Sequence, residues 1–217
     1  MKKVIQLSAL IVLMMLGGCT TPGHVNMPMT TKYDITQFEQ KKVAYNITYQ
    51  DPEHGMFGDG DMLPPMAVSE AHLDFQTRRV FNEFNRILAS QIPSNALITN
   101  KQQPDFTLKV KFVAHDSGGP VVVEDKFGET LLKSAISLGF APYEQEVVAD
   151  FDVTYTVVDK DGETLFTQKY KVNDEVDHEK SNIEFTNESG KNLAGQLFER
   201  NLTLTLNEFM KEFATKS

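Results

Sequence analysis

The chain has 217 residues, of which 41% are hydrophobic, and a formal net charge of −9. These values fit one ordinary domain with extensions and exclude global disorder. The acidic balance disfavours nucleic acid as a partner, because phosphate backbones repel a negatively charged body, and the single cysteine excludes an intrachain disulfide and a cysteine-based zinc site.

The first eighteen residues have the pattern of a bacterial signal peptide. Lys2 and Lys3 form a positively charged start, and an apolar stretch follows over residues 4–16. As a helix, this stretch would span about 20 Å, which is too short to cross a hydrocarbon core of about 30 Å. We therefore expect residues 1–18 to be removed on export. The remaining 19 basic and 30 acidic residues give a net charge of −11.

Leu16-Gly17-Gly18-Cys19 resembles the lipobox of bacterial lipoproteins, in which a leucine and two small residues precede an acylated cysteine. The resemblance implies that palmitate-like acyl chains on Cys19 hold the protein on a membrane. One chain binds only marginally, but two or three anchor stably, because each buried CH₂ contributes about 0.8 kcal/mol. In this class an aspartate after the cysteine favours the inner membrane, so Thr20 favours the outer membrane and a domain facing the periplasm. The alternative is an ordinary secretory peptide with an incidental cysteine.

The residues after the cysteine show little periodicity. Pro22, Gly23, Pro28 and several threonines interrupt any regular pattern. We expect residues 19–40 to form a flexible tether and residues 41–217 to form a single domain.

The domain begins with an alternating pattern over residues 43–49, which predicts a half-buried strand. A loop rich in glycine and proline follows over residues 51–65. Apolar residues at helical spacing then predict an amphipathic helix over Ser69–Ile92, with Ser69 as its N-cap and Pro93 as its end.

Two more strands are expected after this helix. Residues 96–99 fit a short strand, and residues 106–112 alternate strongly until Gly118-Gly119-Pro120 breaks the pattern. Residues 128–142 are apolar and less regular. They fit a short helix inserted between strands, either folded back on the sheet or exposed as a contact surface for a partner or for lipid.

A β-hairpin is the clearest feature of the second half. Apolar residues alternate over 147–157, the turn dipeptide Asp161-Gly162 follows, and the return strand covers 166–172. Residues 174–190 are polar and acidic, as in a surface loop. A long C-terminal helix is expected from Leu193, although residues 202–206 also alternate like a strand.

This order of elements predicts the α+β class. One-faced antiparallel strands need cover for their apolar side, and two amphipathic helices provide it. We expect a two-layer sandwich of a mainly antiparallel sheet with two helices on one face.

The layout resembles a group of small envelope lipoproteins, namely the YajG-like lipoproteins and the auxiliary lipoproteins of ABC-type transport systems. The features that carry the resemblance are the lipobox, the helix over Ser69–Ile92, the strand around residues 105–110, the hairpin over 149–172 and the closing helix. The resemblance covers roughly residues 40–214. It implies binding or scaffolding in the periplasm without catalysis.

Three groups of polar residues are candidate cation or acid–base sites, and for each a solvated loop or turn is the simpler interpretation. The groups are Asp51, Glu53, His54, Asp59 and Asp61; Asp159, Lys160, Asp161 and Gly162; and Asp174, Glu175, Asp177, His178 and Glu179. The first two lack the glutamate that an EF-hand places at its twelfth position, and the third lacks a second histidine at helical spacing. We expect no metal site and no cofactor.

Catalytic motifs are not evident in the sequence. There is no Gly-x-Ser-x-Gly, and Ser117-Gly118-Gly119 fits a turn. We expect a non-enzymatic binding or scaffold component of the cell envelope, with a protein partner that docks on a sheet edge or on residues 128–142. The alternatives are a carrier of a small apolar ligand, with Phe84, Phe106 and Phe151 lining its pocket, and a hydrolase that uses a carboxylate pair.

Overall fold

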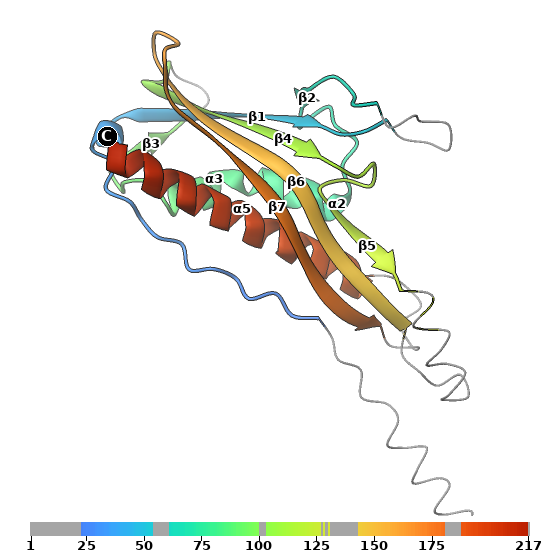
Figure 1. Cartoon of the computed structure of the whole chain (residues 1–217). Coiled ribbons are helices and arrows are strands. Elements are labelled where there is room, and N and C mark those ends of the chain that lie inside the picture. The colour runs from blue at the N-terminus through green and yellow to red at the C-terminus, as the bar shows by residue number, and fades with distance from the viewer. Residues whose placement is uncertain are drawn as a thin grey trace, which may run out of the picture.

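The computed structural model describes residues 23–53, 61–99, 103–126, 128, 130, 143–180 and 188–216 (Figure 1). Cys19, the predicted signal peptide and nearly all of the apolar segment 128–142 lie outside these residues. The described elements are η1 (Thr36–Phe38), β1 (Lys42–Gln50), β2 (Met66–Ala67), α2 (Phe75–Asn82), α3 (Phe84–Ala89), β3 (Leu97–Ile98), β4 (Phe106–Ala114), β5 (Val121–Asp125), β6 (Tyr143–Asp159), β7 (Thr164–Lys180) and α5 (Glu188–Lys216).

The described strands form one seven-stranded sheet of mixed direction. Its main path runs β2-β1-β4-β6-β5, while β3 pairs with β1 and β7 pairs with β6. Strand β1 is parallel to β3 and β4, and the other described pairings are antiparallel. Parallel neighbours need a crossover, which α2 and α3 supply between β1 and β4. The α+β class is confirmed, and the two-layer arrangement stays a prediction.

The predicted hairpin is confirmed and is longer than its sequence pattern suggested. β6 and β7 contain 17 residues each. At the turn, Asp159 Oδ1 accepts hydrogen bonds from the backbone N–H groups of Asp161 and Glu163, and Gly162 adopts a φ of +84°. The loop expected from residue 174 is wrong for residues 174–180, because these residues continue β7 and pair with β6.

The single helix predicted over Ser69–Ile92 is wrong. Its expected cap, Ser69, lies in a turn, and α2 starts at Phe75, where Asp74 Oδ1 accepts from two backbone N–H groups. At Glu83, with ψ near 0°, the helix is interrupted and α3 begins. The described residues therefore contain three α-helices instead of two. The apolar spacing continues through the interruption, so periodicity did not indicate it.

The C-terminal helix is confirmed as α5, and the alternative strand over residues 202–206 is wrong. The hydroxyl groups of Thr203 and Thr205 donate to carbonyl oxygens four residues earlier in the helix, at 2.7 and 2.8 Å. These bonds satisfy the polar atoms of two residues that otherwise favour strands.

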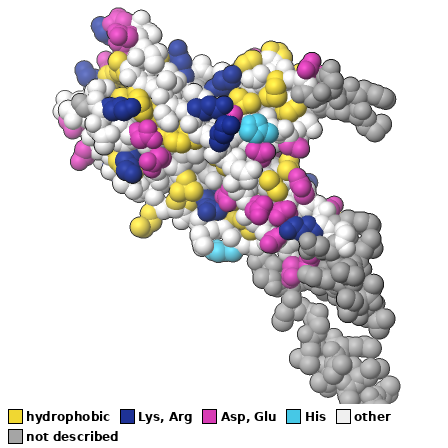
Figure 2. All heavy atoms as spheres, in the orientation of Figure 1, with side chains coloured by type: hydrophobic (Ala, Val, Ile, Leu, Met, Phe, Trp, Pro, Cys, Tyr) yellow, Lys and Arg dark blue, Asp and Glu magenta, His cyan; other side chains and the backbone are white. Residues whose placement is uncertain are grey.

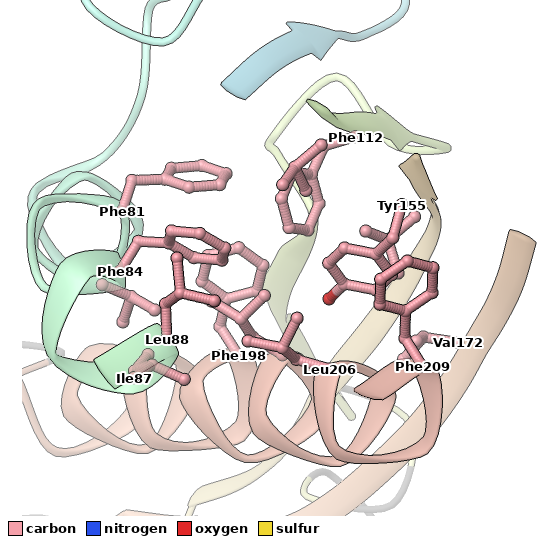
Figure 3. Packing of buried hydrophobic residues seen from close by; sticks show 14 of the residues in the cluster. Phe81, Phe84, Ile87, Leu88, Phe112, Tyr155, Val172, Phe198, Leu206 and Phe209 are labelled. Atoms are coloured by element: carbon pink, nitrogen blue, oxygen red, sulfur yellow. The ribbon is translucent and has the colours of Figure 1, made fainter. Parts of the chain in front are cut away.

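Aromatic rings connect α2, α5 and the sheet (Figure 3). Phe198 of α5 is fully buried, and its ring centroid lies 5.1 Å from Phe81, 5.8 Å from Phe112 and 5.5 Å from Phe151. Each such pair contributes about 0.5–1.5 kcal/mol beyond the burial of its area. This cluster holds α5 against β4 and β6.

The described part of the segment expected to be a tether is packed on the domain instead. Val25, Ile35 and Phe38 are at most 3% exposed and belong to the hydrophobic core. The segment runs beside α5 from the end of β7 to the C-terminal end of the helix (Figure 1). At its start, the N–H of Gly23 donates to Nδ1 of His178 at 3.1 Å. The tether expected over 19–40 therefore does not extend through residues 23–40.

Candidate functional site

A groove of about 640 Å³ lies where β5 meets the first turns of α2 and α5. Its walls are residues 74–76 of the α2 start, 121–123 of β5 and residues of the first turns of α5, with Gly118 at one end. We define these residues as the β5 groove.

One wall of the β5 groove is the free edge of β5. Asp150 N–H donates to Pro120 O at 3.1 Å, and Lys126 N–H donates to Glu144 O at 3.0 Å. In an antiparallel pair alternate residues bond the partner strand, so the even-numbered residues of β5 face β6. The backbone groups of Val121 and Val123 therefore point away from β6, and no described strand pairs with them.

The turn before β5 sets the position of this edge. Asp116 Oδ1 accepts a hydrogen bond from the N–H of Gly118 at 2.6 Å. Gly119 adopts a φ of +119°, which L side chains rarely tolerate. The Gly-Gly-Pro break seen in the sequence thus interrupts the strand, and the chain continues in the same direction along β6 as β5, which brings its three valines to the groove.

The opposite wall carries an exposed aromatic ring. Phe75, the first residue of α2, is 76% exposed, although phenylalanine is usually buried. Nearby, Gln76 Nε2 donates to Asn192 Oδ1 at 2.8 Å and joins α2 to α5. An apolar ring beside a free strand edge suits the side chain of a docked polypeptide.

The described lining of the β5 groove contains three charged residues. Asp74 already caps α2, and Glu188 and Lys191 stand on the first turn of α5. The described lining contains no histidine, serine or cysteine. It does not assemble the nucleophile, base and orienting group that covalent hydrolysis uses.

The first candidate cation group does not converge among the described residues. Asp51 is buried, and its carbonyl oxygen accepts from the N–H of Leu63 at 2.8 Å. Glu53 and Asp61 are joined by a backbone hydrogen bond of 2.9 Å. His54 and Asp59 lie outside the described residues. No group of three or more potential ligands in the described part of the chain is arranged to hold a metal ion.

The third candidate group is divided between the two faces of β7. Asp174 points toward α5 and accepts from Arg200 at 2.9 Å and from Asn201 at 2.8 Å. His178, also on the α5 side, is 5% exposed and lies 2.8 Å from Ser189 Oγ. Asp177 is exposed and pairs with Lys126 at 2.7 Å, as strand alternation requires. Glu175 is likewise exposed, and the group forms no common site.

The residues proposed to line a ligand cavity are packed against other rings. Phe84 and Phe151 are fully buried, and Phe84 lies 5.1 Å from Tyr45. Neither of them lines the β5 groove or a second groove of about 330 Å³ beside Phe106 and Leu165. Phe106 lines this second groove, so it is Phe84 and Phe151 that give the carrier hypothesis no support.

A charged cluster on the outward face of the sheet was not predicted. His115 Nδ1 lies 2.7 Å from Asp150 Oδ1, and Lys169 Nζ lies 2.6 Å from Asp152 Oδ2. Burial raises the pKa of Asp152, but the hydrogen bonds and charges of Lys169 and His115 outweigh burial and leave that pKa lowered. The sequence offered one indication of this cluster, because the register of the hairpin places the oppositely charged residues Asp152 and Lys171 across from each other.

No family model matches the chain, and no curated protein matches it. The structure is similar to a Xanthomonas campestris protein of the family DUF330, with a TM-score of 0.44, 8% identity and coverage of 88% of this chain and 94% of that one. It is also similar to a Helicobacter pylori homolog of neuraminyllactose-binding hemagglutinin, with a TM-score of 0.42, 9% identity and coverage of 90% and 97%. A minor lipoprotein from Acinetobacter baumannii gives a TM-score of 0.38, 9% identity and coverage of 78% and 91%. At these identities no residue's role transfers to this chain.

Among the residues that the structure describes, no helix is both long and apolar enough to span a membrane.

Proposed function

We propose that this chain is a non-enzymatic lipoprotein of the bacterial outer membrane, and that it captures an extended segment of an envelope protein in the β5 groove. The free edge of β5 beside the exposed Phe75 is the observation that supports capture. The lipobox ending at Cys19 supports the anchor. The resemblance to YajG-like and ABC-type auxiliary lipoproteins is part of this proposal.

Strand addition is the binding mode that this geometry favours. An extended polypeptide beside β5 would use the unpaired N–H and C=O groups of Val121 and Val123. Its alternate side chains would contact the valines and the ring of Phe75. Backbone bonds supply affinity in this mode, while the apolar wall selects which segment binds.

The acyl anchor would account for the location of an acidic protein. A mature charge of −11 repels anionic headgroups, so in this proposal lipid chains on Cys19 supply the attachment. Palmitate labelling of cells should mark the wild type and not Cys19→Ser, and only the wild type should need detergent for release. A mature protein with a free thiol at residue 19 would contradict the anchor.

Capture is tested by placing a photoreactive aromatic residue at position 75 in living cells. We expect a cross-linked envelope protein from position 75 and none from position 204, where Leu204 of α5 is 41% exposed and lies outside the groove.

The variant Val123→Pro provides a second test, which concerns strand addition at the edge of β5. Proline removes an N–H that points away from β6, which edge positions tolerate, so the fold should remain while cross-linking at 75 is lost. Val122→Pro removes a hydrogen bond to β6 and is expected to destabilise the sheet. Unchanged cross-linking in a folded Val123→Pro variant would refute strand addition.

A further inference from the structure

The outward face of the sheet separates positive and negative charge along its strands. Four lysines stand at alternate positions of β4 and β7, near the hairpin end of the sheet. We call these residues, Lys109, Lys111, Lys169 and Lys171, the lysine face. The carboxylates of the same sheet face lie toward β5. They are Glu124, Glu146, Asp150, Glu175 and Asp177. Figure 2 shows dark blue side chains gathered over β4 and β6 and magenta ones beyond them toward β5.

Strand register places the lysines in a regular array. Lys111 pairs with Thr154 of β6, and Thr154 pairs with Lys169 of β7, so these two lysines lie in one row across three strands. Lys109 and Lys171 stand two residues along their strands from this row. Repeats along a strand are about 6.7 Å apart, and strands two apart are separated by about 9.6 Å.

Most of this positive charge is not neutralised within the described residues. Lys169 pairs with Asp152, whereas Lys109, Lys111 and Lys171 form no ion pair with a described carboxylate. Four lysines and one carboxylate leave a charge of +3 on a chain whose mature net charge is −11. All four lysines are exposed.

We propose that the lysine face docks an extended acidic segment of a partner protein. In an extended polypeptide every second side chain lies on one side, about 6.7 Å from the next. Carboxylates at alternate residues therefore match the spacing between Lys109 and Lys111 and between Lys169 and Lys171. Opposite charge across such a contact speeds association and fixes the register of the bound segment.

The position of the N-terminus argues against the anchoring membrane as the occupant, a step that rests on the proposed lipidation. Gly23 is bonded to His178 at the far end of β7 from the hairpin. Cys19 is four residue steps from Gly23, a reach of about 14 Å at most. Lys171 is seven residues from His178, about 23 Å along the strand. The acidic end of the sheet therefore lies nearer the bilayer than the lysine face does.

The docking itself can be tested without any membrane. The mature full-length protein in neutral detergent is titrated with a fluorescent peptide of alternating Glu and Thr, and with a Gln and Thr peptide as the uncharged control. We expect saturable binding of the acidic peptide alone. Binding should be lost near 1 M salt, where the screening length is about 3 Å.

A matched pair of variants locates the contact. Lys109→Gln/Lys111→Gln is expected to weaken binding by about 2- to 30-fold, since each exposed ion pair contributes about 0.2–1 kcal/mol. Lys160→Gln/Lys211→Gln removes the same charge from exposed residues of the hairpin turn and α5, and should bind like the wild type. Equal weakening by both pairs, or no binding of the acidic peptide, would overturn the proposal.

An experiment with lipid vesicles distinguishes an acidic protein segment from an anionic membrane as the occupant of the lysine face. The protein is reconstituted in phosphatidylcholine vesicles, and vesicles containing phosphatidylglycerol are added. Tethering of these vesicles through the lysine face, without peptide binding, would overturn docking of a protein segment in favour of lipid. Val123→Pro should leave peptide binding unchanged, so failure of the β5 groove and failure of the lysine face are separable.

Discussion

Substitution of Phe38 by alanine tests whether the segment before β1 belongs to the fold. Its side chain is fully buried, and its ring lies 5.3 Å from Phe106 and 5.4 Å from Phe213. A tether that moved independently of the domain would leave the stability nearly unchanged, within about 0.5 kcal/mol. The packed segment predicts a large loss instead.

The loss can be estimated from the packing. Replacing a buried phenylalanine by alanine typically costs about 3–5 kcal/mol, which includes the cavity that remains. The two ring contacts of Phe38 account for about 0.5–1.5 kcal/mol each within that cost. A domain of this size has a total stability of about 5–15 kcal/mol, so the variant should fold but should unfold at much lower denaturant concentration.

Urea unfolding followed by circular dichroism measures this effect. We expect a lower midpoint with an unchanged slope, which means that native compactness is retained. Met29→Ala is the matched control, because Met29 lies in the same segment and is 90% exposed. A Phe38→Ala midpoint equal to that of Met29→Ala would refute the packing of this segment.

Three further predictions concern single residues. Lys169→Gln should raise the pKa of Asp152 in a carboxyl NMR titration, and an unchanged pKa would contradict the pairing. Because the pKa of Asp152 is lowered in the folded wild type, its carboxylate stabilises the fold at pH values above its ordinary pKa of about 4. This contribution is lost as the pH falls through the pKa of the folded state. Gly162→Ala should cost about 1–2 kcal/mol in urea unfolding, because its φ of +84° is strained for alanine, and a neutral result would contradict that turn geometry. Asp74→Ala should cost about 0.5–2 kcal/mol through loss of the α2 cap, and Asp74→Asn much less; equal losses would show that the cap is not the cause.

Local chemistry made several elements predictable from the sequence. The alternation over 147–157 and the Asp161-Gly162 turn specify a hairpin within one short stretch of chain. The strands β1 and β4 and the helix α5 also follow from their own periodicity. The lipobox is likewise a local pattern, although its lipidation stays a prediction.

The candidate docking surfaces were less visible in the sequence. Strand β5 has only five residues, too few for alternation to be read with assurance, and nothing in the sequence places it beside Phe75. The four lysines of the lysine face are spread over about sixty positions. They meet because β6 pairs with β4 on one side and with β7 on the other.

The sequence alone therefore determined the elements that depend on neighbouring residues. These are the hairpin, its turn, the amphipathic strands and the long final helix. The tertiary structure decided which strands pair, where the predicted helix divides at Glu83, and that Val25, Ile35 and Phe38 are buried. The physical reason is that burial depends on the apolar surface that distant segments present. A few isolated hydrophobic residues among prolines carry no period of their own until a core exists to receive them.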